Sequence, residues 1–247
     1  MIDYESKVKN WFTNHGYEIN KIPESNEESP DFLIADDTSI YLLELKTKFP
    51  SEEELDERRQ VLSSGEIHNI DEIITFQKGL SKIISKAKNQ LKNYKKGEEI
   101  LRLVWLVSTG HLAEPRLDQF ETTLYGSTYL QTTERYGNCY FFYNSDFFKY
   151  RDVLDAAIVS TASKGKLLLN PLSPRYTRMK NSSLINHFID GSIIDPMKLD
   201  KEEQAFLVDS DVNRAEEQAV LQYLKEKYKT DKIAVVTMHY MSGTMDF

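Results

Sequence analysis

One short stretch of the chain combines strand-like apolar residues with charged residues that a buried strand rarely holds. Residues 29–46 read as two apolar strands joined by a polar turn, with Asp31 at the start of the first strand and Glu44 and Lys46 near the end of the second. Side chains two residues apart on a strand point to the same face. Glu44 and Lys46 therefore project together, and the hairpin can bring Asp31 close to them.

This grouping predicts a chemical site, because burying a charge costs several kcal/mol unless it is paired or bound to an ion. Two carboxylates and one ammonium around one point suit a hard divalent cation with a water-activating neighbour. Oxygen ligands without sulfur or imidazole favour Mg²⁺ or Mn²⁺ over Zn²⁺. A purely structural alternative stays open, in which Asp31, Glu44 and Lys46 form only a buried ion pair.

The spacing of these residues resembles a known signature. Pro30-Asp31, twelve intervening residues and then Glu44-Leu45-Lys46 resemble the motif of the PD-(D/E)xK, or restriction-endonuclease-like, nuclease superfamily. The resemblance implies an α/β fold with a mixed β-sheet core flanked by helices. It also implies that Asp31 and Glu44 bind Mg²⁺, with Mn²⁺ as a substitute, and that the Leu45 carbonyl completes the shell. Lys46 would orient or deprotonate the attacking water.

Three further residues, on two predicted helices, fit the same resemblance. Glu5 falls within the apolar arc of an amphipathic helix expected over residues 3–15, and many superfamily members carry a Glu there that points at the metal. Gln90 and Tyr94 resemble the Q-x-x-x-Y motif of the RecB-like branch, which implies a catalytic role for Gln90 and a nucleic-acid contact for Tyr94. Simpler interpretations stay open: a glutamate at the edge of the apolar stripe for Glu5, and an ordinary core tyrosine for Tyr94.

The distribution of charge says more than its sum. The net charge is −8, which argues against indiscriminate binding to nucleic acid. Residues 78–97 nevertheless hold seven lysines and no acidic residue. Lys82 and Lys86 flank Gln90 on the predicted helix and are candidates for phosphate contacts, although charge runs are usually solvated faces. Arg175 and Arg178, in a basic and aromatic segment, are further candidates for gripping nucleic acid.

Other classes of protein find little support. The only cysteine, Cys139, excludes an internal disulfide and fits a reducing compartment. We see no apolar run of 18 residues and no signal peptide, so we expect a cytoplasmic protein without membrane contact. The five histidines are dispersed, and no zinc, serine-hydrolase, Walker or dinucleotide motif is present.

Hydrophobic patterns predict the order of elements. After the first helix we expect strands at 31–36 and 39–47, a helical excursion over 50–76, a basic helix at 77–95 and a buried strand at 101–108. A strand at 138–144 and a helix to about 158 follow. The superfamily core then covers residues 1–158, and residues 159–247 form a C-terminal α/β extension, with a helix at 211–228 and a strand at 233–238.

Together these features predict a divalent-metal-dependent nuclease that acts on nucleic acid, with DNA favoured over RNA. Restriction or anti-phage defence is an expectation by analogy alone. We expect a homodimer, since cutting both strands of a duplex needs two sites or two encounters. The alternative is a catalytically silent nucleic-acid-binding or assembly module of the same fold.

Overall fold

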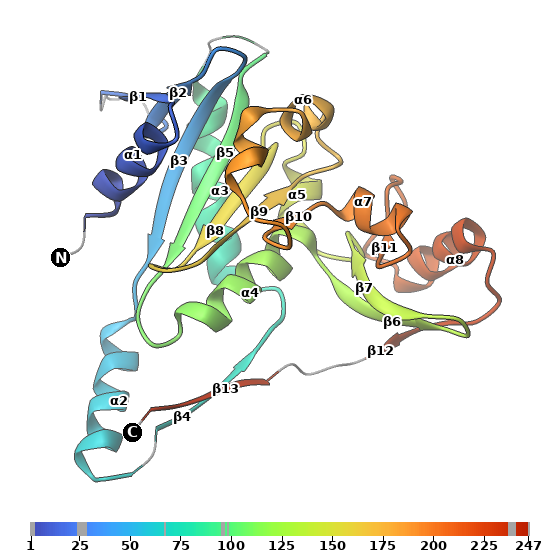
Figure 1. The fold of residues 1–247 in the computed structure, drawn as a ribbon. Helices are drawn as coiled ribbons and strands as arrows, with labels where there is room; N and C mark the ends of the chain where they lie inside the picture. Colours follow the sequence, from blue (N-terminus) through green and yellow to red (C-terminus); the bar gives the residue numbers. More distant parts are fainter. Residues whose placement is uncertain are drawn as a thin grey trace.

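The computed structural model describes residues 3–23, 29–66, 68–94, 97, 99–236 and 241–246. A seven-stranded mixed sheet runs through the molecule in the order β1-β2-β3-β5-β8-β9-β10 (Figure 1). Its strands are β1 (Glu18–Lys21), β2 (Phe32–Ala35), β3 (Ile40–Lys48), β5 (Leu101–Ser108), β8 (Ala156–Ser160), β9 (Gly165–Leu169) and β10 (Ile193–Ile194). Helices flank this sheet, so the expectation of an α/β fold with a mixed sheet is confirmed.

The predicted hairpin forms almost residue for residue. β2 and β3 pair antiparallel from Phe32 opposite Leu43 to Ala35 opposite Ile40. The turn is closed by Asp36, whose Oδ1 accepts the N–H groups of Thr38 at 2.6 Å and Ser39 at 2.7 Å. An Asp side chain that bonds the backbone two residues on stabilises a tight turn. The hairpin register is therefore fixed by local sequence.

β3, β5 and β8 run parallel to one another at the centre of the sheet. Parallel strands are covered on both faces and read as continuous apolar runs, which is why β5 lies at the predicted 101–108. The connection from β3 to β5 holds α2 (Glu52–Ser63), β4 (His68–Ile73) and α3 (Lys78–Asn93). The helical excursion is thus confirmed for α2, whereas β4 is a strand that the prediction missed. Of the predicted helix 77–95, residue 95 lies outside the described residues.

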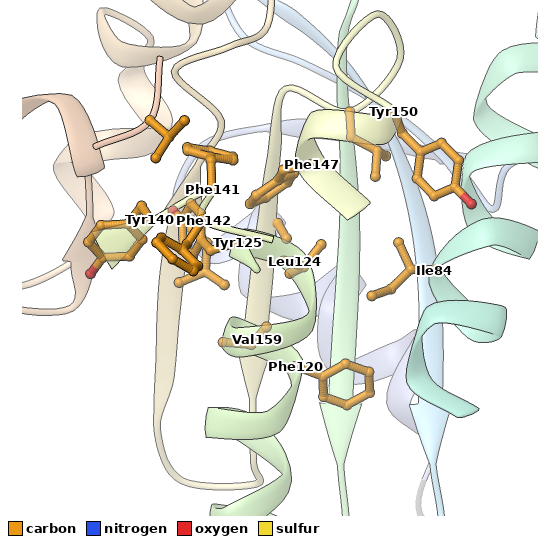
Figure 2. Close-up of a cluster of buried hydrophobic side chains, with 14 of the residues drawn as sticks. Ile84, Phe120, Leu124, Tyr125, Tyr140, Phe141, Phe142, Phe147, Tyr150 and Val159 are labelled. Atoms are coloured by element: carbon orange, nitrogen blue, oxygen red, sulfur yellow. The ribbon is translucent and has the colours of Figure 1, made fainter. Parts of the chain in front are cut away.

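Helices cover both faces of the sheet. On one face lies α1 (Tyr4–Asn14), which buries Tyr4, Val8 and Phe12. On the other lie α3 and α4 (Ala113–Tyr125), over a larger apolar cluster. Figure 2 shows Ile84 of α3 and Phe120 of α4 in this cluster, next to a group of aromatic side chains.

Helix α4 was missed because its buried face is not an apolar stripe. The face includes the polar residues Arg116, Gln119, Thr122 and Thr123, so the usual periodicity is absent. The helix ends at Gly126, which has a φ of 60°. A Cβ there would meet the Tyr143 carbonyl oxygen at 2.0 Å, so this end needs glycine.

A second sheet, in the order β11-β7-β6-β12, lies beside the first. Its strands are β6 (Thr128–Thr132), β7 (Tyr136–Tyr140), β11 (Phe206–Leu207) and β12 (Ile233–Val236). A separate two-stranded sheet consists of β13 (Met241–Asp246) and β4. The strand predicted at 138–144 begins and ends earlier, as β7. The helix predicted to about 158 is wrong: α5 covers only Asp146–Lys149, and the fully buried run Ala156–Ser160 is strand β8.

The proposed boundary at residue 158 falls inside β8. β9 pairs antiparallel with β8, and β10 pairs parallel with β9, so the C-terminal third adds two strands to the main sheet. The remaining helices are α6 (Tyr176–Lys180), a 3₁₀ helix (Ser183–His187), α7 (Pro196–Lys201) and α8 (Glu217–Tyr228). α8 begins six residues later than predicted, and residues 237 and 238 of the predicted last strand lie outside the described residues. In the described chain, no helix combines the length and apolar content needed to cross a bilayer.

One buried charge joins the C-terminal third to the central strands. Asp155 is fully buried and accepts the Arg102 N–H at 2.7 Å and the Arg175 Nε–H at 2.9 Å. Burial raises the pKa of Asp155, so its charged form depends on the Arg175 guanidinium. Arg178 instead forms a looser ion pair with the exposed Glu99 at 3.4 Å.

We predict that Arg175→Ala lowers the free energy of unfolding by about 3 kcal/mol, because it leaves Asp155 buried without a counter-charge. The matched control Arg178→Ala should cost less than about 1 kcal/mol, as exposed pairs do. Urea unfolding, followed by the fluorescence of Trp11 and Trp105, measures both. Equal, small effects of the two substitutions would show that Arg175 has no such structural role.

Candidate active site

The hairpin register places two carboxylates side by side. Phe32 pairs with Leu43, so Asp31, which directly precedes β2, stands next to Glu44. Glu44 is fully buried, although it is an acidic residue, because its neighbours on β3 form a buried apolar strand. Asp31 is half-buried and accepts the Leu45 N–H through Oδ2 at 2.8 Å. N–H and C=O of one strand residue point to the same edge, so the Leu45 carbonyl also faces the side of Asp31.

Lys46 and Gln90 complete the cluster. The Lys46 ammonium donates to Glu44 Oε1 and to Gln90 Oε1, the latter at 2.8 Å. Gln90 in turn donates from Nε2 to the Ser29 carbonyl at 3.1 Å. The amide of Gln90 therefore ties α3 to the lysine and to the segment that leads into Asp31. The structure thus brings together four of the predicted residues: Asp31, Glu44, Lys46 and Gln90.

Ionisation of the two carboxyl groups, Glu44 and Asp31, is unfavourable. Burial raises the pKa of Glu44 to about 7, although its bond to Lys46 and the charge of that residue act in the opposite direction. Burial also raises the pKa of Asp31. Glu44 Oε2 is buried and has no hydrogen-bond partner of normal geometry among the described residues, although the backbone N–H of Asp31 acts to lower the pKa of this carboxyl. A cation at this oxygen would offset both effects.

The residues present fit a hard divalent cation. The orphaned Glu44 oxygen, the adjacent Asp31 carboxylate and the Leu45 carbonyl are oxygen donors of the type that Mg²⁺ prefers. Within the described ranges, no group of three or more Asp, Glu, His or Cys side chains is arranged as a metal site. Two carboxylates and water or substrate oxygens suit Mg²⁺, which usually keeps several waters.

Glu5 lies at the rim of the cluster. It is about half exposed and forms an ion pair with Lys21 at 2.5 Å, so the expected orientation within the buried stripe of α1 is wrong. It is close enough that its charge contributes to the raised pKa of Asp31. Its role as a metal ligand stays a prediction.

The predicted nucleic-acid contacts lie in different environments. Lys82 and Lys86 are exposed on α3, and no ion pair engages either in the described part of the chain. Tyr94 is half-buried against the larger core cluster, which favours the interpretation as a core tyrosine. Arg175 and Arg178 lie near the start of β5 and β8, bound to Asp155 and Glu99, whereas Glu44 lies at the middle of β3 and Lys46 in its second half. Their nucleic-acid role stays a prediction.

Sequence reasoning missed two cationic residues beyond Lys46. Lys48 is half-buried and follows Glu44 and Lys46 on the same face of β3, and the alternation of charged residues over 44–48 was a signal for it. Arg116 on α4 is buried, and no pattern in its segment marks it. A cavity of about 340 Å³ on the α1 face is lined by Trp11 and Trp105 and holds none of the predicted site residues.

No protein-family model matches this chain, and no curated protein or solved structure is significantly similar to it.

We predict that Glu44→Gln changes how stability depends on pH. Folding raises the pKa of Glu44 from 4.5 to about 7, so the folded protein holds this proton more tightly than the unfolded chain. The contribution of Glu44 to stability is present below about pH 4.5 and is lost as the pH rises to about 7. Glu44→Gln avoids this loss and should gain about 1–3 kcal/mol over the native protein between pH 5 and pH 8.

The free energies of unfolding of Glu44→Gln and the native protein, measured in EDTA at pH 5 and at pH 8, give this gain in stability. Glu134→Gln, which changes an exposed carboxylate outside this cluster, is the control and should follow the native protein. Parallel pH profiles for Glu44→Gln and the native protein would contradict the assignment of a buried, hard-to-ionise carboxyl.

Proposed function

We propose that the protein is a divalent-metal-dependent nuclease that hydrolyses phosphodiester bonds of DNA, with a restriction-endonuclease-like core. The observation that carries the proposal is the buried Glu44 carboxylate, which has one oxygen without a partner beside Asp31 and the other against Lys46. A hairpin followed by a helix that supplies Gln90 agrees with the superfamily pattern. Mg²⁺ is the proposed cofactor, and Mn²⁺ its substitute.

Each residue has a definite task in this proposal. When bound, the metal ion would supply charge neutralisation at the scissile phosphate and lower the pKa of a nearby water. Asp31 and Glu44 hold it through carboxylate oxygens. Lys46 orients the attacking water and offsets negative charge that develops on the phosphate. Gln90 acts on Lys46 as a positioning residue, because its amide fixes the ammonium beside Glu44.

The charge balance disfavours the structural alternative. Asp31 and Glu44 together carry two negative charges when ionised, and Lys46 is the only cation bonded to Glu44 among the described residues. A buried ion pair that serves stability alone should leave no oxygen unsatisfied. The silent binding module is the other alternative, and a test for cleavage separates it from the nuclease.

A nucleic acid, with DNA favoured, is the proposed substrate because basic residues that can contact backbone phosphates gather on the helix beside the site. Lys82 and Lys86 are exposed on the flank of α3 that also carries Gln90, and they are available to phosphates. The protein as a whole carries a charge of −8, so the acidic remainder should repel DNA elsewhere. A two-fold homodimer is the assembly proposed for cutting both strands, and defence against foreign DNA is a proposed setting by analogy.

We predict that Asp31→Ala, Glu44→Ala and Lys46→Ala each lower cleavage at least about a hundredfold while the fold is kept. The assay incubates purified protein with plasmid, linear DNA, single-stranded DNA or RNA, with Mg²⁺, Mn²⁺ or EDTA. Lys92→Ala, an exposed lysine elsewhere on α3, is the control and should stay active. Native-like cleavage by Glu44→Ala would exclude this site as the catalytic centre.

We predict that Lys82→Ala/Lys86→Ala weakens binding to all DNA sequences alike. The slope of log K against log salt should fall by roughly two, because each lysine that pairs with a phosphate contributes about 0.9 to it. Lys88→Ala/Lys92→Ala is the matched control, because it removes the same charge from the other side of α3. Gln90→Ala should lower turnover and leave the slope nearly unchanged.

An unchanged affinity and slope for the Lys82/Lys86 variant would mean that this flank is a solvated face. The search for the binding surface would then move to Arg175 and Arg178.

A further inference from the structure

A second cavity, which is lined mainly by polar residues, lies next to the candidate active site. It encloses about 260 Å³ between the end of β3, the start of α3 and helices α2 and α4. Lys48, Gln77, Gly79, Arg116 and Gln119 line it, together with Glu54. Glu44, Lys46 and Lys48 are each two residues apart and therefore lie on the same face of β3. The cavity at Lys48 is thus the next site along this face after the candidate active site.

The start of α3 faces this cavity without a cap. The 16-residue helix begins at Lys78, and the residue before it, Gln77, makes no side-chain capping bond. The first amides of a helix have no partner within the helix, and the dipole makes that end partly positive. Gly79 adds no side chain over these amides, and a Cβ built there has no atom within 4 Å. The amides are therefore accessible to an anion.

Arg116 provides independent evidence that the cavity binds an anion. Its side chain is 5 % exposed, and its Nη2 donates to Glu54 Oε1 at 2.5 Å. Its Nη1 is buried and has no hydrogen-bond partner in the described structure. An unsatisfied guanidinium donor in a buried position is costly. An oxyanion in the cavity would satisfy it, because guanidinium groups bind phosphate oxygens strongly.

The net charge around the cavity is positive. Lys48 and Arg116 are both cationic, and Glu54 is the one acidic residue among the described residues that line the cavity. Both oxygens of Glu54 are already used, since Oε1 binds Arg116 and Oε2 accepts the Ser51 N–H at 2.6 Å. The helix dipole of α3 adds to the positive side of the balance.

We propose that this cavity binds a phosphate group, namely the backbone phosphate that neighbours the scissile one on the same strand. The ligand class stands on the cavity itself, whereas the assignment to the substrate strand rests on the proposed nuclease function. Lys46 and Lys48 are two residues apart on β3, which corresponds to about 6.6 Å and is comparable with the separation of successive phosphates along a nucleic-acid strand. The Arg116 Nη1, the Lys48 ammonium and the first amides of α3 would donate to its oxygens.

The test uses a substitution that places a carboxylate of the protein in the cavity, where it competes with a bound phosphate. Gly79 has room for a side chain and no positive φ, and an acid in the first turn of a helix is stabilising. Gly79→Asp should therefore fold and should exclude phosphate, and Gly79→Asn is the matched neutral control. Calorimetric titration with inorganic phosphate, in EDTA at constant ionic strength, measures binding. We expect saturable binding that Gly79→Asp and Lys48→Gln each weaken at least tenfold, while Gly79→Asn stays within threefold of the native protein.

A second arm distinguishes a backbone phosphate from free phosphate. In the Glu44→Gln background, Lys48→Gln should lower the slope of log K against log salt for duplex DNA by about 0.9. Phosphate binding with an unchanged DNA slope would overturn the assignment to the substrate strand. No saturable phosphate binding, or equal binding by Gly79→Asp and the native protein, would overturn the site itself. Phosphate binding by a protein that does not cleave nucleic acid would overturn the nuclease function and leave the phosphate site standing.

Discussion

The pairing of β2 with β3 is the interaction on which the rest of the site depends. This register sets Asp31 beside Glu44 and puts Glu44 on the face that α3 covers. A slip by one residue would turn Glu44 to the α1 face and bring Leu43 to its position. The apolar residues that flank Glu44 on β3 hold the register, so the hydrophobic core stabilises a carboxylate that is unfavourable where it lies.

Helix α3 links the two parts of the proposed site. Near its end, Gln90 bridges Lys46 and the Ser29 carbonyl. Its start opens onto the cavity that holds Lys48 and Arg116. Because its apolar face, with Ile84, is packed in the core, the helix holds both groups at fixed positions along β3. A rigid element of this kind positions functional groups better than a loop does.

Local signals in the sequence were enough for the hairpin, β5 and α3. Alternation, a continuous apolar run and a helical stripe each report burial directly. They were also enough for Asp31, Glu44 and Lys46, because strand alternation and the hairpin fix which of these side chains lie together. Gln90 was assigned to the same cluster through the resemblance to a known motif, since helix periodicity alone does not show which strand a helix residue contacts.

Features that depend on distant contacts were not predictable in this way. α4 buries polar residues such as Arg116, whose partner Glu54 lies 62 residues away, and no local pattern reveals such a pair. β8 was mistaken for the end of a helix, because its burial comes from β5 and from β9 of the C-terminal third. Glu5 was placed by helix angle alone, and the ion pair with Lys21 lies outside what that angle can show.

The proposed site requires Glu44 and Asp31 to hold a divalent cation. Titration of the native protein and Glu44→Gln with Mn²⁺ between pH 6 and pH 8, followed by electron paramagnetic resonance, tests it most directly. Because the pKa of Glu44 is about 7, a proton competes with the metal below that pH. We expect the native protein to bind Mn²⁺ with an affinity that weakens by about tenfold for each pH unit below 7, and we expect Glu44→Gln to lose this binding. Mn²⁺ binding that is the same in both proteins and independent of pH would contradict it.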